Sequence, residues 1–399
     1  MYQQQQQIMF SDLGLQPIVL QAVQKYLTTN EDLIRPTEIQ ALSIPTLLSP
    51  QHRHVLCAAE TGSGKTLAYL LPVIQQLMVD EQKHGIKRRL DHPRALILVP
   101  TRELVSQVVK TCKQLSHTVK FRSLGVERVQ RSKVIPQLAS GPVDILVTTP
   151  TAMQLLLKQQ MVSLADTRYM VMDEADSLFD AGWGEDCRQL IDTIQTIHHD
   201  RPRKEKMMIV SATLPRSVHT TLDKLFPHLV KITTPSLHRA LPNLKQSFID
   251  LQRFQGNRQL ALLEVLKKNI KDEKTLVFCN TKKAVELVHQ WLETKNVQAL
   301  PLYKDAPIDR DEALTRFADK TSGDNVMIST DIASRGIDTT FVDHVILYDF
   351  PTSVVDYLHR VGRTARAGTV GKASSLIGRK DRMMADRIRR SIREGTVMT

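Results

Sequence analysis

Short apolar runs alternate along the chain with longer segments whose apolar residues recur at helical spacing. The runs are rich in valine, isoleucine and leucine without polar alternation, which is typical of strands buried on both faces of a parallel sheet. A first series of expected strands covers residues 54–59, 95–100, 144–148, 170–172 and 208–211; a second covers 275–279, 297–302, 326–329, 344–348 and 373–377. This alternation predicts an α/β fold built from right-handed βαβ units.

The alternation is interrupted once, between Lys231 and Gln246, where two prolines and several turn-forming residues occur. We therefore predict a first domain at residues 1–234, a linker at 235–246 and a second domain at 247–399, and the 399 residues suffice for two domains. Two charged segments, 83–94 and 201–206, are expected to be surface loops. The arginine-rich segment 379–393 is expected to be helical.

The net charge of +12 indicates a polyanionic partner, either nucleic acid or an anionic membrane surface, although a basic enzyme without such a partner is an alternative. No run of about 18 apolar residues occurs, so no bilayer span and no membrane partner are expected. None of the four cysteines, at positions 57, 112, 187 and 279, has C-x-x-C spacing, which argues against zinc and disulfides and favours a reducing compartment. The glutamine-rich segment Met1–Met9 resembles neither a signal nor a transit peptide and is expected to be a frayed end.

A candidate phosphate-binding loop follows the first expected strand and precedes a helix. It reads Ala59, Glu60, Thr61, Gly62, Ser63, Gly64, Lys65 and Thr66. This matches the pattern G-x-x-x-x-G-K-[ST] except at Ala59, which replaces the first glycine. The glycines let backbone N–H groups face phosphates, and the helix N-terminus adds its dipole. We expect Lys65 to hold the β- and γ-phosphates and Thr66 to bind Mg²⁺; the alternative is a glycine-rich turn without chemistry.

An acidic group follows the apolar residues Tyr169–Met172 and reads Asp173, Glu174, Ala175 and Asp176. A carboxylate at the C-terminal end of such a strand lies beside the phosphate loop in folds of this kind. Asp173 is therefore expected to complete the Mg²⁺ coordination and Glu174 to polarise the attacking water. Taken alone, the group is equally typical of an acidic strand-to-loop turn.

These motifs and their order resemble the DEAD-box RNA helicase family, and the resemblance runs from Phe10 to Gly368. It implies a helicase core of two tandem RecA-like parallel-sheet domains that binds ATP and Mg²⁺. It also implies RNA-stimulated ATP hydrolysis and local opening of an RNA duplex by bending one strand.

The resemblance assigns an adenine-reading segment to residues 10–15 and 36–40. It implies that Phe10 stacks on the base and that Gln40 hydrogen-bonds its edge, which would favour ATP over GTP. The alternatives are a core aromatic for Phe10 and a solvated helix residue for Gln40.

Three further motifs of the family have counterparts here. Ser211-Ala212-Thr213 resembles the motif thought to couple domain closure to unwinding, with Asp176 as its partner. Residues 330–338 resemble the fifth motif, which implies that Asp338 approaches the ribose. Residues 359–368 resemble the sixth motif, in which Arg363 and Arg366, three apart on one helical face, look like arginine fingers. Such a finger contributes about 10³ to 10⁵ in rate, and the alternative is a basic surface helix.

RNA contacts are implied for residues in both domains: Pro100, Thr101, Arg102, Gly125, Thr149, Pro150, Thr330, Arg335 and Gly336. In the family these segments grip the sugar–phosphate backbone of single-stranded or duplex RNA. Backbone contacts carry no base information, so binding is expected to be sequence-tolerant and salt-sensitive.

The sequence departs from the family pattern at three places that concern RNA. Thr151-Ala152 replaces Gly-Arg after Thr149-Pro150, a single glycine at Gly125 replaces a pair, and only Arg310 remains of the Q-x-x-R pattern at 307–310. We therefore expect modest RNA affinity in the core, supplemented by the basic segment Arg379–Arg393.

Residues 35–37, 58–61 and the linker resemble organellar DEAD-box helicases that assist assembly of the large mitochondrial ribosomal subunit. This implies ribosomal RNA and ribosome-assembly proteins as partners and a mitochondrial location. Separately, the protein is expected to be a monomer. The nucleus, nucleolus and cytoplasm are the alternative locations.

Three other functions compete with the RNA helicase. An ATP-gated RNA clamp with little unwinding would use the same motifs. A phosphate-loop enzyme such as a kinase would not need Arg363 and Arg366 in a second domain. A DNA helicase is disfavoured by the Asp173–Asp176 motif and by the segment around Gln40.

Overall fold

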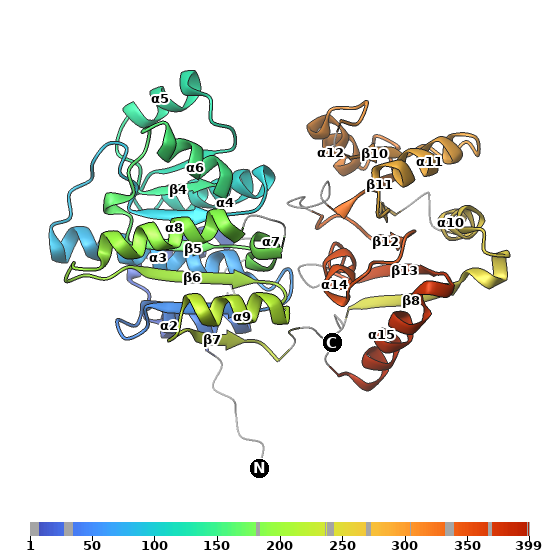
Figure 1. The fold of residues 1–399 in the computed structure, drawn as a ribbon, viewed down its shortest axis with the longest axis horizontal. Helices are drawn as coiled ribbons and strands as arrows, with labels where there is room; N and C mark the ends of the chain where they lie inside the picture. The colour runs from blue at the N-terminus through green and yellow to red at the C-terminus, as the bar shows by residue number, and fades with distance from the viewer. Residues whose placement is uncertain are drawn as a thin grey trace, which may run out of the picture. The chain divides into compact units, whose positions relative to one another are not determined.

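The computed structural model describes residues 8–27, 35–180, 184–235, 237, 243–268, 273–303, 305–331, 339–365, 369–396 and 398. The chain divides into two compact units, unit 1 at Met1–Pro235 and unit 2 at Ser236–Thr399 (Figure 1). The division lies within one residue of the predicted end of the first domain. The linker is shorter than the predicted 235–246, because a strand of unit 2 already begins at Leu244.

Unit 1 contains a seven-stranded parallel sheet in the order β3-β4-β2-β5-β6-β1-β7. Its strands are β1 (His54–Ala58), β2 (Ala95–Leu98), β3 (Ser123–Val126), β4 (Ile145–Thr148), β5 (Tyr169–Met172), β6 (Lys206–Ser211) and β7 (Val230–Thr233). Every residue of β2, β4, β5 and β6 is buried, as expected for strands covered on both faces.

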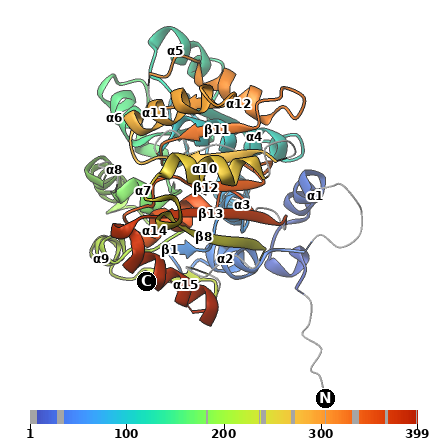
Figure 2. The same cartoon turned by 90° about the vertical axis from the view of Figure 1, so that its right-hand side faces the viewer.

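Helices cover both faces of this sheet (Figures 1 and 2). One face carries η1 (Phe10–Leu13), α1 (Pro17–Leu27), α2 (Glu38–Leu48), α3 (Lys65–His84) and α4 (Arg102–Ser116). The other carries α5 (Arg131–Ala139), α6 (Pro150–Lys158), η2 (Leu164–Asp166), α7 (Ala175–Asp180), α8 (Gly184–His198) and α9 (Arg216–Leu225). The two hydrophobic cores therefore lie on opposite sides of one sheet.

Unit 2 contains a six-stranded parallel sheet in the order β10-β11-β9-β12-β13-β8. Its strands are β8 (Leu244–Asp250), β9 (Thr275–Phe278), β10 (Leu300–Leu302), β11 (Val326–Ser329), β12 (His344–Leu347) and β13 (Gly371–Ile377). One face packs on α10 (Arg258–Lys267) and α11 (Lys282–Glu293), after η3 (Leu251–Phe254). The other packs on α12 (Arg310–Ala318), α14 (Val354–Val361) and α15 (Arg382–Glu394), which follows η4 (Arg379–Asp381).

All ten expected strands are present, and the helix predicted at residues 379–393 corresponds to α15. Three further strands, β3, β7 and β8, were not predicted. The two predicted surface loops are partly wrong. Helix α3 continues to His84, and Lys206 is the first residue of β6, where it is only 6% exposed. None of the helices in the described part of the chain is long and apolar enough to cross a bilayer.

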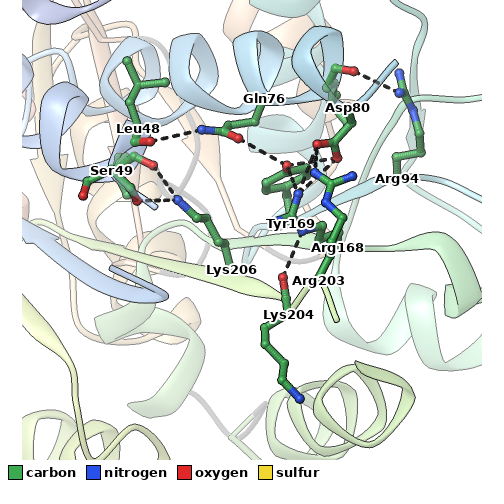
Figure 3. A network of polar contacts seen from close by, with 12 residues as sticks. Leu48, Ser49, Gln76, Asp80, Arg94, Arg168, Tyr169, Arg203, Lys204 and Lys206 are labelled. Carbon is green, nitrogen blue, oxygen red and sulfur yellow. Dashed lines mark hydrogen bonds and ion pairs between the residues drawn. The ribbon is translucent and has the colours of Figure 1, made fainter. Parts of the chain in front are cut away.

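A buried ion-pair network around Asp80 includes Arg203, from the second of these two segments (Figure 3). Asp80 of α3 is 4% exposed and accepts hydrogen bonds from Arg168 Nη1 at 3.1 Å, from the Tyr169 hydroxyl at 3.0 Å and from Arg203. Arg168 Nε donates to the Lys204 carbonyl at 2.9 Å. The network thus fastens α3 to the amino-terminal ends of β5 and β6.

Replacing Asp80 with asparagine should destabilise unit 1 by about 3 kcal/mol, because Arg168 and Arg203 would keep their charge without a carboxylate partner. Chemical denaturation followed by circular dichroism measures the change. A matched control is Asp223→Asn on α9, whose ion pair with Lys231 is solvent-exposed and should contribute little. Equal destabilisation by both substitutions would contradict a structural role for the network.

Candidate nucleotide-binding site

The loop between β1 and α3 has the conformation that a phosphate-binding loop requires. Gly62 and Gly64 have φ angles of +80° and +86°, which side-chain-bearing residues rarely adopt. Lys65 is the first residue of α3, and its Nζ atom donates to the carbonyl oxygens of Ala59 and Glu60, both at 2.6 Å. The ammonium group is therefore held against the loop, at the N-terminus of a 20-residue helix.

Gln40 of α2 is fixed against the same loop. Its Nε2 atom donates to the Gly64 carbonyl at 3.0 Å, and its Oε1 atom accepts from the Thr37 backbone N–H at 2.9 Å. The side chain is only 4% exposed, so the interpretation as a solvated helix residue is wrong. An amide nitrogen carries two N–H groups, so the contact with Gly64 occupies only one of them. Hydrogen bonding of the other to adenine stays a prediction.

Phe10 lies in η1 and is 6% exposed within the core that covers one face of the sheet. The ring is therefore a core aromatic, as the alternative interpretation predicted. Stacking of Phe10 on adenine stays a prediction. The segment after it is tied to α3 by Gln75, whose Nε2 atom donates to the Gly14 carbonyl at 2.9 Å and whose Oε1 atom accepts from the Gln16 N–H at 2.6 Å. The sequence analysis did not identify Gln75.

The acidic motif begins at the C-terminal end of β5. Asp173 is 7% exposed, and its Oδ2 atom accepts a 2.9 Å hydrogen bond from the hydroxyl of Tyr69, a fully buried residue of α3. Burial raises the pKa of Asp173 to about 6, the neighbouring Glu174 adds to this rise, and Lys65 opposes it. Tyr69 was missed by the sequence analysis, although it follows Lys65 by four residues and so shares its helical face.

The oxygen donors of Asp173 and Thr66 suit Mg²⁺ better than a metal ion whose ligands all come from protein side chains. Asp173 supplies a carboxylate and Thr66 a hydroxyl in the first turn of α3. The described residues contain no group of three or more His, Cys, Asp or Glu side chains arranged to hold a metal. Mg²⁺ typically uses one or two protein oxygens together with water and substrate phosphates.

The residues predicted to couple domain closure to unwinding lie together. Asp176 is 2% exposed, and its Oδ2 atom accepts from the backbone N–H of Thr213 at 2.9 Å and from the Thr213 hydroxyl. The Ser211 hydroxyl donates to the Thr213 carbonyl at 2.5 Å and accepts from the Asp176 N–H at 3.3 Å. A movement of either segment would therefore be transmitted to the other.

The RNA-binding segments predicted in unit 1 leave the sheet side by side, because Leu98 of β2 pairs with Thr148 of β4. Pro100 is buried, Thr101 is the N-cap of α4, and Arg102 is exposed. Thr149 is the N-cap of α6 and precedes Pro150.

Gly125 and the pair Thr151-Ala152 have structural roles within unit 1. A Cβ atom at Gly125 would lie 2.8 Å from Val109 Cγ2, so this glycine lets α4 approach β3. At the departure from the family pattern, the Thr151 hydroxyl donates to Asp186 Oδ2 at 3.2 Å and Ala152 is buried, so the position contributes no cation.

In unit 2, Arg360 is the central ion-pairing residue of the sixth motif, and the sequence analysis missed it. It is 3% exposed, and its Nε and Nη2 atoms each donate to Asp331 at 2.6 Å. Its guanidinium also donates to the Asp349 carbonyl and to Asn280 Oδ1, and lies 5.4 Å from the centre of the Phe278 ring. Arg360 thus joins the fifth and sixth motifs.

The helical-face argument for the two arginine fingers is wrong. Helix α14 ends at Val361 with Gly362 as its C-cap, so Arg363 lies in the following turn, where it is 7% exposed. Thr330 directly follows β11. The predicted site residues Arg335, Gly336, Asp338 and Arg366 lie outside the described residues.

Replacing Gly64 with alanine should weaken binding of a fluorescent ATP analogue by at least about tenfold. The new Cβ atom would lie 2.5 Å from Gln40 Nε2, so the loop and Gln40 must separate. Gly85→Ala at the other end of α3 is a matched control, because its φ is also positive (+61°) but nothing lies within 4 Å of the new Cβ atom. It should cost about 1–2 kcal/mol of stability and leave nucleotide affinity unchanged. Equal loss of affinity in both variants would mean that backbone strain alone causes the effect.

The sequence and the fold both match known helicases. Residues 37–221 match the DEAD/DEAH box helicase family, and residues 257–368 match the helicase conserved C-terminal domain. Among solved structures, Mss116p bound to ssRNA and AMP-PNP superposes with a TM-score of 0.80 at 22% identity, over 98% of this chain and 78% of that one. S. cerevisiae Dbp5 bound to RNA and ADP BeF3 gives a TM-score of 0.75 at 24% identity, over 97% and 93%. The fold is thus the predicted pair of RecA-like domains.

Curated relatives share more of the sequence. The probable ATP-dependent RNA helicase DDX28 of Homo sapiens is 37% identical, over 90% of this chain and 68% of that protein. DEAD-box ATP-dependent RNA helicase 39 of Arabidopsis thaliana is 35% identical over 96% of this chain, which spans 61% of that protein's length. The ATP-dependent RNA helicase mrh4, mitochondrial, of Sclerotinia sclerotiorum is 31% identical over 91% and 73%. The phosphate loop, the Asp173–Asp176 motif and these matches together show that the chain belongs to the DEAD-box ATP-dependent RNA helicases.

Proposed function

We propose that the chain hydrolyses ATP in a cycle that RNA stimulates and that opens or remodels RNA locally. The observation that carries the proposal is the position of Asp173. This carboxylate is hydrogen-bonded to Tyr69, on the same helix that begins with Lys65. This hydrogen bond ties a carboxylate suited to Mg²⁺, at the end of β5, to the helix whose first residue is the proposed phosphate-binding lysine.

Each residue has a distinct role in this proposal. Lys65 exchanges its contacts with the loop carbonyls for the β- and γ-phosphates, and backbone N–H groups of residues 60–66 surround the phosphates. Asp173 and Thr66 hold Mg²⁺, which neutralises charge on the phosphate oxygens when it is bound. Glu174 takes up the proton of the attacking water. Glu174 has a positive φ of 50°, which turns the chain sharply at the strand end.

The contribution of unit 2 is proposed from the family resemblance. Arg363 and Arg366 supply positive charge to the γ-phosphate, and Asp338 contacts the ribose. Arg363 directly follows the C-cap of α14, the helix that carries the buried Arg360. A displaced Arg360 would therefore also displace Arg363.

Glu174→Gln should abolish RNA-stimulated ATP hydrolysis while leaving ATP binding intact, because the amide cannot accept a proton from water. The expected loss of steady-state rate is about 10²- to 10⁴-fold, measured with and without single-stranded RNA. Asp192→Asn, an exposed substitution on α8 with the same change in charge, should behave like the native chain.

The three possible outcomes have different meanings. Hydrolysis by the native chain that RNA does not affect would contradict the proposed coupling. Strong RNA stimulation that Glu174→Gln removes would leave only the extent of unwinding open. Long retention on RNA with very slow turnover would identify the native chain as a clamp.

We further propose that the protein acts in mitochondria on ribosomal RNA during assembly of the large ribosomal subunit. The support is the resemblance of residues 35–37 and 58–61 to organellar helicases and the word mitochondrial in the name of the mrh4 relatives. The net charge of +12 is consistent with an RNA partner.

The location can be tested by imaging the tagged full-length protein with a mitochondrial marker. Co-localisation and protection from added protease in isolated mitochondria are expected. A nucleolar, nuclear or cytoplasmic signal would contradict the mitochondrial assignment without affecting the proposed ATPase activity.

A further inference from the structure

Much of the protein's positive charge lies in one short segment. The chain carries a formal charge of +12, and the 15 residues Arg379–Arg393 contain seven basic and two acidic residues, a net of +5. Counted in the same way, the whole of residues 236–399 has 27 basic and 20 acidic residues, a net of +7. Without this segment, the second unit would be nearly neutral.

The structure folds this segment into η4 and helix α15, which packs beside the edge strand β8 (Figures 1 and 2). Ala385 and Ile388 are buried, and Met384 and Ile392 pack against the core of unit 2. The apolar side of the helix is therefore occupied by its own domain. The opposite side faces solvent.

Two of the arginines hold the helix to the sheet. Arg382 forms an ion pair with Asp250 of β8 at 3.1 Å. The guanidinium of Arg389 lies 4.9 Å from the centre of the Phe248 ring and pairs with Asp386 at 3.2 Å. Their charge is largely used within the domain.

Five cations of the segment are exposed to solvent and form a basic ridge, which we define as Arg379, Lys380, Arg387, Arg390 and Arg393. Residues 387, 390 and 393 are spaced by three on α15, so each side chain lies about 4.5 Å along the axis from the next. With the two cations of η4, the ridge extends roughly 20 Å, at 1.5 Å per helical residue. An array of this length can contact several consecutive phosphates.

We propose that this basic ridge is a binding site for the RNA sugar–phosphate backbone, outside the residues through which RNA and ATP are bound together. The inference rests on the proposed function, because it gives the helicase a second contact with the same RNA. The ridge lies on an element that is already folded and has no part in the phosphate loop. Its RNA contact is therefore independent of nucleotide, and it keeps the protein on its substrate between ATP cycles.

RNA fits this ridge better than an anionic membrane does. A helix that binds a bilayer surface needs a free apolar face beside its basic residues. On α15 the apolar face packs on the core of unit 2. Met383 is a large apolar side chain of this helix that is exposed, at 81%, and a single such side chain does not make an apolar face. Exposed cations without a free apolar face beside them are typical of a phosphate backbone partner.

The test compares a variant with Arg387, Arg390 and Arg393 all changed to glutamine with the native full-length chain. Binding of fluorescent single-stranded RNA without nucleotide is measured over a range of salt concentrations. We expect the Kd to rise at least about tenfold near 0.1 M salt and the slope of log K against log salt to fall by about 2, since each phosphate contact contributes about 0.7. The RNA-stimulated kcat at saturating RNA should remain unchanged.

Two further variants separate charge from structure. Changing Lys267, Lys268 and Lys320 to glutamine removes the same charge from exposed positions of unit 2 and should leave RNA binding close to native. Changing the three arginines of α15 to lysine keeps the charge and should restore most of the affinity. Unchanged circular dichroism and melting temperature would show that the glutamine variant is folded.

Several results would overturn the proposal. These are native RNA affinity in the glutamine variant, an equal loss in the Lys267, Lys268 and Lys320 variant, or a fall in kcat at saturating RNA. Loss of binding to phosphatidylserine vesicles with unchanged RNA binding would identify a membrane surface instead. If RNA does not stimulate the native ATPase but the glutamine variant still loses RNA affinity, the ridge stands and the proposed function fails.

Discussion

The site depends on the parallel arrangement of the strands within unit 1. In a parallel sheet all strands end at the same edge, and neighbouring strands place their following loops next to each other. Strands β5, β6 and β1 are consecutive in the sheet. The phosphate loop, the acidic motif and the segment 211–213 are therefore brought together, although they are up to about 150 residues apart in the chain.

Burial at this edge gives the site its electrostatic character. Asp173 is withdrawn from water and has a pKa raised to about 6, and burial also lowers the pKa of Lys65 while the surrounding carboxylates oppose that change. In such an environment charges interact more strongly than in water. The lysine, the carboxylates and the hydroxyl of Tyr69 must therefore be considered together.

The two edges of the sheet of unit 1 have different tasks. The carboxyl edge carries glycines at positive φ in the loop between β1 and α3, together with the polar groups proposed to bind nucleotide. The amino edge carries the ion-pair network of Asp80, in which the charged groups are paired within the domain (Figure 3).

The sequence by itself determined the central strands, the phosphate loop, the acidic motif and the division into two units, because each depends on residues that are close in the chain. The three strands that it did not predict, β3, β7 and β8, all lie at sheet edges, where the strands are only partly buried and carry polar residues or glycine among the apolar ones. Only the tertiary structure decided the roles of Tyr69, Gln75 and Arg360. Tyr69 and its partner Asp173 are 104 residues apart, and no local pattern records which distant polar groups will satisfy one another once both are buried.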